Sequence, residues 1–117
     1  MSDCSSEVVE AWASTPYATR FDAVVMSWSE GLRKPDPRLY ATAADRLGVA
    51  PSECWYVGDG GGRELSGAHA ATMRPVLVTN ARTPAAAGHR ADPDDYPPEC
   101  SIAELGELLA LVGQASE

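Results

Sequence analysis

The sequence is poor in lysine and in positive charge, which excludes two classes of binding partner. Lys34 is the one lysine among nine basic residues, and 17 acidic residues give a formal net charge of −8. A surface that binds nucleic acid needs basic side chains to meet the phosphates, and docking to anionic lipid needs them as well. The charge balance therefore argues against a nucleic-acid partner and against a membrane partner.

Cysteines and long apolar runs are also scarce. Cys4, Cys54 and Cys100 are odd in number, widely spaced and without a C-x-x-C pair. This pattern predicts reduced thiols and argues against a disulfide framework or a zinc site. No apolar run approaches the roughly 18 residues of a membrane span, and no basic, apolar leader opens the sequence. We expect a cytoplasmic protein.

Large aliphatic side chains are few. Leu, Val, Ile and Phe together are 20 of the 117 residues, whereas alanine alone supplies 19. That share, about 17%, lies below the roughly 20% at which a charged chain is suspected of disorder. Three Trp and four Tyr compensate in part, because each buries a large area. The length fits one small domain, residues 1–117, and its core is expected to be thin.

The hydrophobic pattern predicts strands that alternate with helices. Short continuous apolar runs indicate buried strands, and apolar residues at helical spacing indicate amphipathic helices. The expected strands are Asp22–Ser27, Cys54–Val57 and Pro75–Thr79, and the expected helices are 7–13, 36–47, 64–71 and 101–113. This order predicts βαβ units, and therefore an α/β fold with a parallel sheet.

Two of the helices carry start signals. Asp36 and Pro37 have the residue types of an N-cap and a first helical position, and Gly48 is placed to end that helix. Ser101-x-x-Glu104 has the capping-box pattern, which predicts that the last helix begins there. Between residues 79 and 101 the chain is rich in proline and acid, so residues 80–100 are expected to form an exposed loop.

Two polar segments follow the first two expected strands and are candidates for a site. They are S-E-G-L-R-K-P-D-P, which contains Lys34, and G-D-G-G-G-R-E, which contains Asp59 and Glu64. In an open parallel sheet, ligands bind beyond the carboxyl ends of the strands, so both segments are expected at one edge. The two carboxylates are hard oxygen donors that suit Mg²⁺.

Each of these features also has a purely structural interpretation. The glycine-rich segment alone is typical of a flexible strand-to-helix turn, in which Glu64 favours the helix N-terminus through the helix dipole. Taken by itself, Lys34 is what is expected of a charged side chain in a solvent-exposed loop. The segment is not a P-loop, and Arg63 stands where G-x-G-x-x-G requires its third glycine.

Residues from about 2 to 79 resemble the C-terminal half of a haloacid-dehalogenase-superfamily hydrolase. The likeness rests on K-P-D-P, a helix that ends in L-G-V-x-P, then V-G-D-G and E-L-x-G-A, in this order and spacing. The resemblance implies a Rossmann-like parallel sheet in three layers. It also implies Mg²⁺-dependent phosphatase chemistry for most members, with dehalogenases and phosphotransferases among the others.

The resemblance further implies roles for four residues. Lys34 corresponds to the lysine that neutralises the phosphoryl oxygens and the nucleophile. Asp59 corresponds to the acid that ligates the metal, and Glu64 takes the place of a second acid that helps to hold it. Ser2 is similar to the Ser or Thr that hydrogen-bonds the phosphoryl group, a weaker match because no strand precedes it. Mg²⁺ and a small phosphorylated substrate are the implied cofactor and partner.

The sequence departs from the family at its nucleophile, an Asp in a D-x-D-x-T/V segment at the end of the central first strand. No such segment is present, and the nearest string, Asp92-Pro93-Asp94, lies in the proline-rich loop. The aspartyl-phosphate route requires that carboxylate. The cap module that usually sets substrate choice is absent too. We therefore expect an incomplete sheet without its central strand, whose exposed edges invite a protein partner.

Three functional hypotheses follow. In the first, the chain is a truncated and by itself inactive portion of a Mg²⁺-dependent phosphomonoester hydrolase. In the second, it is a non-catalytic interaction module that uses its open sheet edges. In the third, a separate polypeptide supplies the missing D-x-D strand and complements it.

Overall fold

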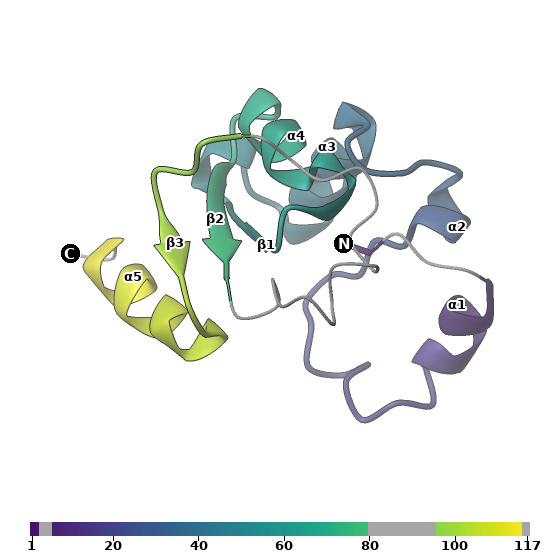
Figure 1. Cartoon of the computed structure of the whole chain (residues 1–117). Helices are drawn as coiled ribbons and strands as arrows, with labels where there is room; N and C mark the ends of the chain where they lie inside the picture. The colour runs from purple at the N-terminus through teal and green to yellow at the C-terminus, as the bar shows by residue number, and fades with distance from the viewer. Residues whose placement is uncertain (3–5, 80–95, 116–117) are drawn as a thin grey trace.

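The computed structural model describes residues 1–2, 6–79 and 96–115, and its central element is a small parallel sheet (Figure 1). The sheet has three strands in the order β1-β2-β3, with both neighbouring pairs parallel. These strands are β1 (Trp55–Gly58), β2 (Arg74–Val78) and β3 (Ser101–Ile102). The predicted α/β fold with a parallel sheet is confirmed.

Helices cover both faces of this sheet and make three layers. The strands place successive side chains on opposite faces, so Tyr56 and Leu77 join one buried cluster while Val76 and Val78 join another. The first cluster packs against α3 (Pro37–Leu47) and α4 (Glu64–Ala70), and the second against α5 (Leu108–Ala115). The thin core expected from the composition is therefore divided between two faces.

Helix α3 follows its sequence signals closely. The Asp36 carboxylate accepts a hydrogen bond from the backbone N–H of Arg38 at 2.9 Å, and Pro37 occupies the first turn. Gly48 ends the helix in the left-handed conformation, with φ of 73°. Side-chain hydrogen bonds from the Arg38 guanidinium, more than the backbone bond, hold the pKa of Asp36 below its ordinary value.

The remaining described elements are short. Helices α1 (Ser6–Trp12) and α2 (Ser27–Glu30) precede α3, and α2 begins at the last residue of the segment predicted as a strand. Three single 3₁₀ turns link the larger elements: η1 (Pro51–Glu53), η2 (Gly61–Arg63) and η4 (Leu105–Glu107). None of the helices in the described ranges is long and apolar enough to cross a membrane.

The prediction of a strand over Asp22–Ser27 is wrong. Within this segment only Met26, whose backbone is extended with φ of −119°, forms a bridge, and it is parallel to Ser2. Two backbone hydrogen bonds hold the bridge, from Ser2 N–H to the Val25 carbonyl at 3.0 Å and from Ser27 N–H to the Ser2 carbonyl at 2.9 Å. A ladder needs a neighbour of comparable length, and the described neighbour here is only residues 1–2.

The prediction that the last helix begins at Ser101 is also wrong. Ser101–Ile102 is β3, held to β2 by bonds from Leu77 N–H to the Cys100 carbonyl and from Thr79 N–H to the Ile102 carbonyl. The ladder and the burial of Ile102 against the sheet outweigh the local capping signal. The Glu107 carboxylate accepts the N–H of Ala103 at 3.3 Å, and α5 follows. Residues 80–95 of the expected loop lie outside the described residues.

Gly67 provides a test of the packing between α3 and α4. A Cβ at this helical position would lie 2.5 Å from the Tyr40 hydroxyl oxygen and 2.8 Å from the Pro35 Cβ. We expect Gly67→Ala to lower the free energy of unfolding by about 1–3 kcal/mol through overpacking, measured by urea denaturation.

Gly113→Ala is the matched control, because Gly113 is also helical and nothing lies within 4 Å of its added Cβ. This substitution should raise the stability by about 0.5–1 kcal/mol, since alanine costs less backbone entropy than glycine in a helix. Equal effects of the two substitutions would contradict the packing described here.

Candidate active site

The carboxyl end of β1 brings together two segments that are far apart in the sequence. The Lys34 ammonium nitrogen lies 3.0 Å from Oε1 of Glu64, although 30 residues separate them. Both side chains are largely withdrawn from solvent, with exposed fractions of 14% and 6%. The structure therefore places the predicted cation and one of the predicted acids at one edge of the sheet.

Three hydrogen-bond donors hold the carboxylate of Glu64. Its Oε1 accepts the Tyr56 hydroxyl at 2.7 Å as well as the Lys34 ammonium, and its Oε2 accepts the Gly60 N–H at 2.9 Å. A buried carboxylate is stable only when its oxygens find such donors. These three bonds explain how a charged side chain occupies an otherwise apolar interior.

Gly58 leaves the space that the Glu64 carboxylate fills. A Cβ built at Gly58 would collide with all three atoms of the Glu64 carboxyl group. Any larger residue at this end of β1 would displace the acid from Lys34. The V-G-D-G motif therefore requires a glycine at this position, because the Glu64 carboxylate lies directly against the backbone there.

Asp59 follows Gly58 directly, at the start of the glycine-rich loop. Its Oδ1 accepts the N–H of Gly61 at 3.0 Å, which ties the carboxylate to the turn. Gly60 and Gly62 adopt positive φ, at 94° and 61°, and so does Arg63 at 51°. The turn needs these left-handed conformations to reach the first residue of α4 within a few residues.

The described carboxylates of this edge do not by themselves form a metal site. Asp59 offers a hard oxygen donor that suits Mg²⁺, whereas the Glu64 oxygens are occupied by three protein donors. Within the described ranges, no group of three or more His, Cys, Asp or Glu residues is arranged to hold a metal ion. A Mg²⁺ ion bound to Asp59 would need further ligands besides these two carboxylates.

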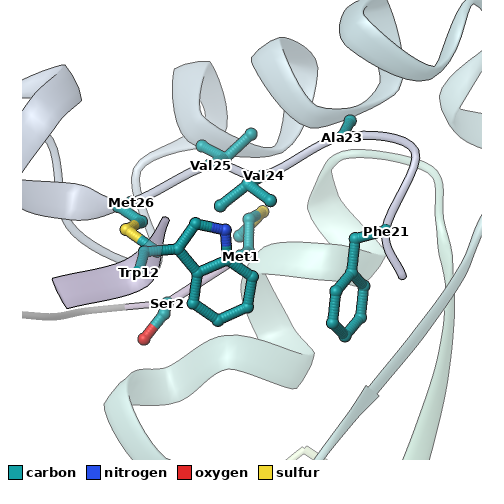
Figure 2. A pocket seen from close by; sticks show the side chains of 8 residues that line it. All are labelled: Met1, Ser2, Trp12, Phe21, Ala23, Val24, Val25 and Met26. Carbon is teal, nitrogen blue, oxygen red and sulfur yellow. The ribbon is translucent and has the colours of Figure 1, made fainter. Parts of the chain in front are cut away.

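Ser2 lies at the bridge to Met26. Its backbone makes both bridging hydrogen bonds, and its side chain is exposed. Figure 2 shows it at the border of a small apolar pocket, with its hydroxyl directed away from Phe21. This pocket has a volume of about 240 Å³ and is lined by Met1, Ser2, Trp12, Phe21 and residues 23–26. The predicted phosphate contact of Ser2 stays a prediction.

Sequence reasoning missed two tyrosines of the site. Tyr56 donates to the Glu64 carboxylate, and Tyr40 donates to the Glu64 backbone carbonyl at 2.7 Å. Both rings are buried and contact each other, with centroids 5.4 Å apart. From sequence alone, a tyrosine in a strand or on the apolar face of a helix is predicted to be a core residue. The hydrogen-bond partner of its hydroxyl becomes known only from the fold.

A family model for the haloacid dehalogenase-like hydrolases matches residues 5–72. A phosphoserine phosphatase from Thermus thermophilus is 34% identical over 92 residues, which are 79% of this chain and 34% of that protein. A glyceraldehyde 3-phosphate phosphatase from Methanopyrus kandleri is 34% identical over 99 residues, 83% of this chain and 40% of that protein. The chain thus spans about a third to two fifths of the length of these relatives.

Solved structures show the same arrangement of elements. A dehalogenase crystallised as an intermediate complex superposes with a TM-score of 0.68 at 26% identity, over 93% of this chain and 46% of the other. The L-2-haloacid dehalogenase of Xanthobacter autotrophicus gives a TM-score of 0.73 at 24% identity, over 94% and 52%. This second likeness shows the fold alone, and the first again covers less than half of the larger protein.

The ion pair at this edge makes a prediction about stability. We expect Glu64→Ala to lower the free energy of unfolding by about 3 kcal/mol or more, because it leaves the Lys34 charge without its carboxylate in a mostly buried position. Urea denaturation measures this loss.

Glu30→Ala serves as the control, since Glu30 pairs with Arg46 at a more exposed position. Its loss should cost less than about 1 kcal/mol, as is usual for surface ion pairs. If the two substitutions cost the same, the Lys34–Glu64 pair is not buried in solution.

Proposed function

The chain belongs to the haloacid dehalogenase-like hydrolase family, and on this premise we propose that it is the phosphate-binding part of a Mg²⁺-dependent phosphomonoesterase. The observation that carries the proposal is the Lys34–Glu64 pair beside Asp59 at the carboxyl end of β1. The two phosphatase relatives support phosphomonoesters as the substrate class. The proposed location is cytoplasmic.

The described residues supply charge and orientation to this proposed reaction. The Lys34 ammonium neutralises the oxygens of the phosphoryl group as negative charge develops on them. Glu64 holds the ammonium in place, and Asp59 offers one oxygen ligand to the metal. Bound Mg²⁺ would supply further charge neutralisation to the phosphoryl oxygens.

The nucleophile has to come from outside these 117 residues. In the proposed reaction, its carboxylate oxygen bonds to phosphorus while the bond between phosphorus and the alcohol oxygen breaks, and the departing alkoxide takes a proton from water. Water then hydrolyses the acyl phosphate, which releases inorganic phosphate and restores the carboxylate. The chain alone therefore binds the phosphoryl group without turning it over.

A groove beside β1 supports the proposal that a further strand, which carries the nucleophile, belongs to this sheet. Its volume is about 370 Å³, and it lies between β1 residues, such as Trp55 and Val57, and Met1, which precedes Ser2 of the Ser2–Met26 bridge. Ala43, Ala44 and Leu47 of α3 also line it, so its wall is mainly apolar. β1 is one of the two edge strands of the described sheet. A strand that entered here, from a longer product or a separate chain, would pair with a free edge.

A non-catalytic interaction module is the second candidate. Helix α5 packs Leu108 and Leu111 against the sheet, yet Leu109 and Val112 on the same helix are 80% and 45% exposed. Exposed apolar side chains that cluster on one helix are typical of a surface that binds another protein. In this candidate, the open face and the open sheet edge are the functional features.

Catalytic assays separate these candidates. The purified 117-residue chain is expected to give no Mg²⁺-dependent turnover of p-nitrophenyl phosphate, because it holds no nucleophile. A longer product isolated from the source should turn it over, and Lys34→Ala or Asp59→Ala in that product should lower kcat by about 100-fold or more. Turnover by the short chain that Asp59→Ala abolishes would overturn the proposal, and so would an inactive longer product.

Cys54 reports whether the groove is filled. Its side chain lines the groove, and burial, followed by the nearby Glu53 carboxylate, raises the pKa of its thiol. In the short chain, iodoacetamide should alkylate Cys54, at a rate that still rises with pH beyond the point where an unperturbed thiol is fully ionised.

In a longer product whose own strand fills the groove, alkylation of Cys54 should slow markedly. Cys100 is the internal control, because it is half-buried against the other face and should react alike in both. Mass spectrometry of the alkylated peptides measures both thiols. Equal Cys54 rates in the two products would show that nothing covers the groove.

A further inference from the structure

We propose that Tyr56 is a positioning residue of this site: its hydroxyl fixes the Glu64 carboxylate and thereby sets the location of the Lys34 ammonium. The use of that ammonium for phosphoryl groups rests on the proposed function. The geometric claim itself concerns the chain as it is, without substrate or metal. It adds to the site a residue outside both polar segments.

One carboxylate oxygen is shared between the phenol and the ammonium. Oε1 of Glu64 accepts the Tyr56 hydroxyl at 2.7 Å and the Lys34 ammonium at 3.0 Å, while Oε2 accepts the Gly60 N–H. The two carboxylate oxygens are thereby made distinct, one directed at Lys34 and one at the loop. Without the phenol, Oε1 keeps only the bond from the Lys34 ammonium, so two donors hold the carboxylate where three held it before.

Tyr56 is suited to this task because its own position is fixed from several sides. It lies in the middle of β1, in parallel register with Pro75 of β2. Its ring is buried and packs against Tyr40, with an angle of 49° between the planes. Lys34 and Glu64 have long side chains that lose rotamer freedom when ordered, whereas Tyr56 brings a rigid donor from the sheet.

Tyr40 provides a matched comparison within the same pair of rings. Its hydroxyl donates to the backbone carbonyl of Glu64 at 2.7 Å and does not contact the carboxylate through that bond. It therefore secures the first turn of α4, while Tyr56 secures the side chain of the same residue. Tyr40→Phe and Tyr56→Phe each remove one buried hydroxyl near Glu64, but only the second removes a carboxylate bond.

The single lysine of the chain allows a direct test. In protein labelled with ¹⁵N-lysine, the side-chain ammonium gives one signal, which comes from Lys34. We expect Tyr56→Phe to shift this signal and to speed its hydrogen exchange with water about tenfold or more, as loss of a charge-assisted bond implies. Tyr40→Phe should lower the thermal stability yet leave the signal in place, and Glu64→Gln should displace it.

Two results would overturn the proposal. One is a Lys34 signal unchanged in Tyr56→Phe, and the other is an equal change in Tyr40→Phe, which would mark a general loss of packing. If Tyr56→Phe does not fold, the unsubstituted chain decides: the ammonium should show cross-relaxation to the Tyr56 ring protons, and its absence excludes the shared oxygen. None of these readouts requires activity, so the phosphatase proposal can fail while this one stands.

Discussion

The burial of one carboxylate is the constraint on which this site depends. Glu64 is almost completely covered, and its two oxygens take donors from three separate segments: the loop after α2, the strand β1 and the glycine-rich turn. A charge in such a place is tolerated only with partners of this kind. The requirement draws the three segments together, and it explains why the carboxyl end of β1 is ordered around an acid.

The glycines of the site follow from the same constraint. Because Gly58 has no side chain, the Glu64 carboxylate can lie against the strand. Gly60 donates its N–H to this carboxylate from a left-handed conformation with φ of 94°. Gly67, one turn into α4, gives the same freedom to Tyr40. What reads in the sequence as a flexible, glycine-rich stretch is therefore a tightly packed support for one side chain. This packing shows that the stretch is an ordered turn and not a loose one.

The incomplete sheet gives the site its second property. The relatives and the superposed structures are longer proteins, and the chain matches about a third to a half of their length. The groove beside β1 and the single bridge between Ser2 and Met26 are features of a sheet with room for another strand. In the proposed enzyme, the phosphate-binding charges and the nucleophile thus belong to different segments, and joining them completes both the sheet and the chemistry.

The sequence by itself determined the α/β class, helix α3 with its Asp36 and Gly48 ends, and the family, because these depend on local spacing and residue type. It also indicated Lys34, Asp59 and Glu64. Only the tertiary structure decided that Ser101–Ile102 is a strand and that Asp22–Ser27 is not, since a ladder depends on what lies alongside. The hydrogen bonds from the two tyrosine hydroxyls to Glu64 likewise could not be predicted from the sequence. A hydrogen bond between distant residues exists only once the chain has folded.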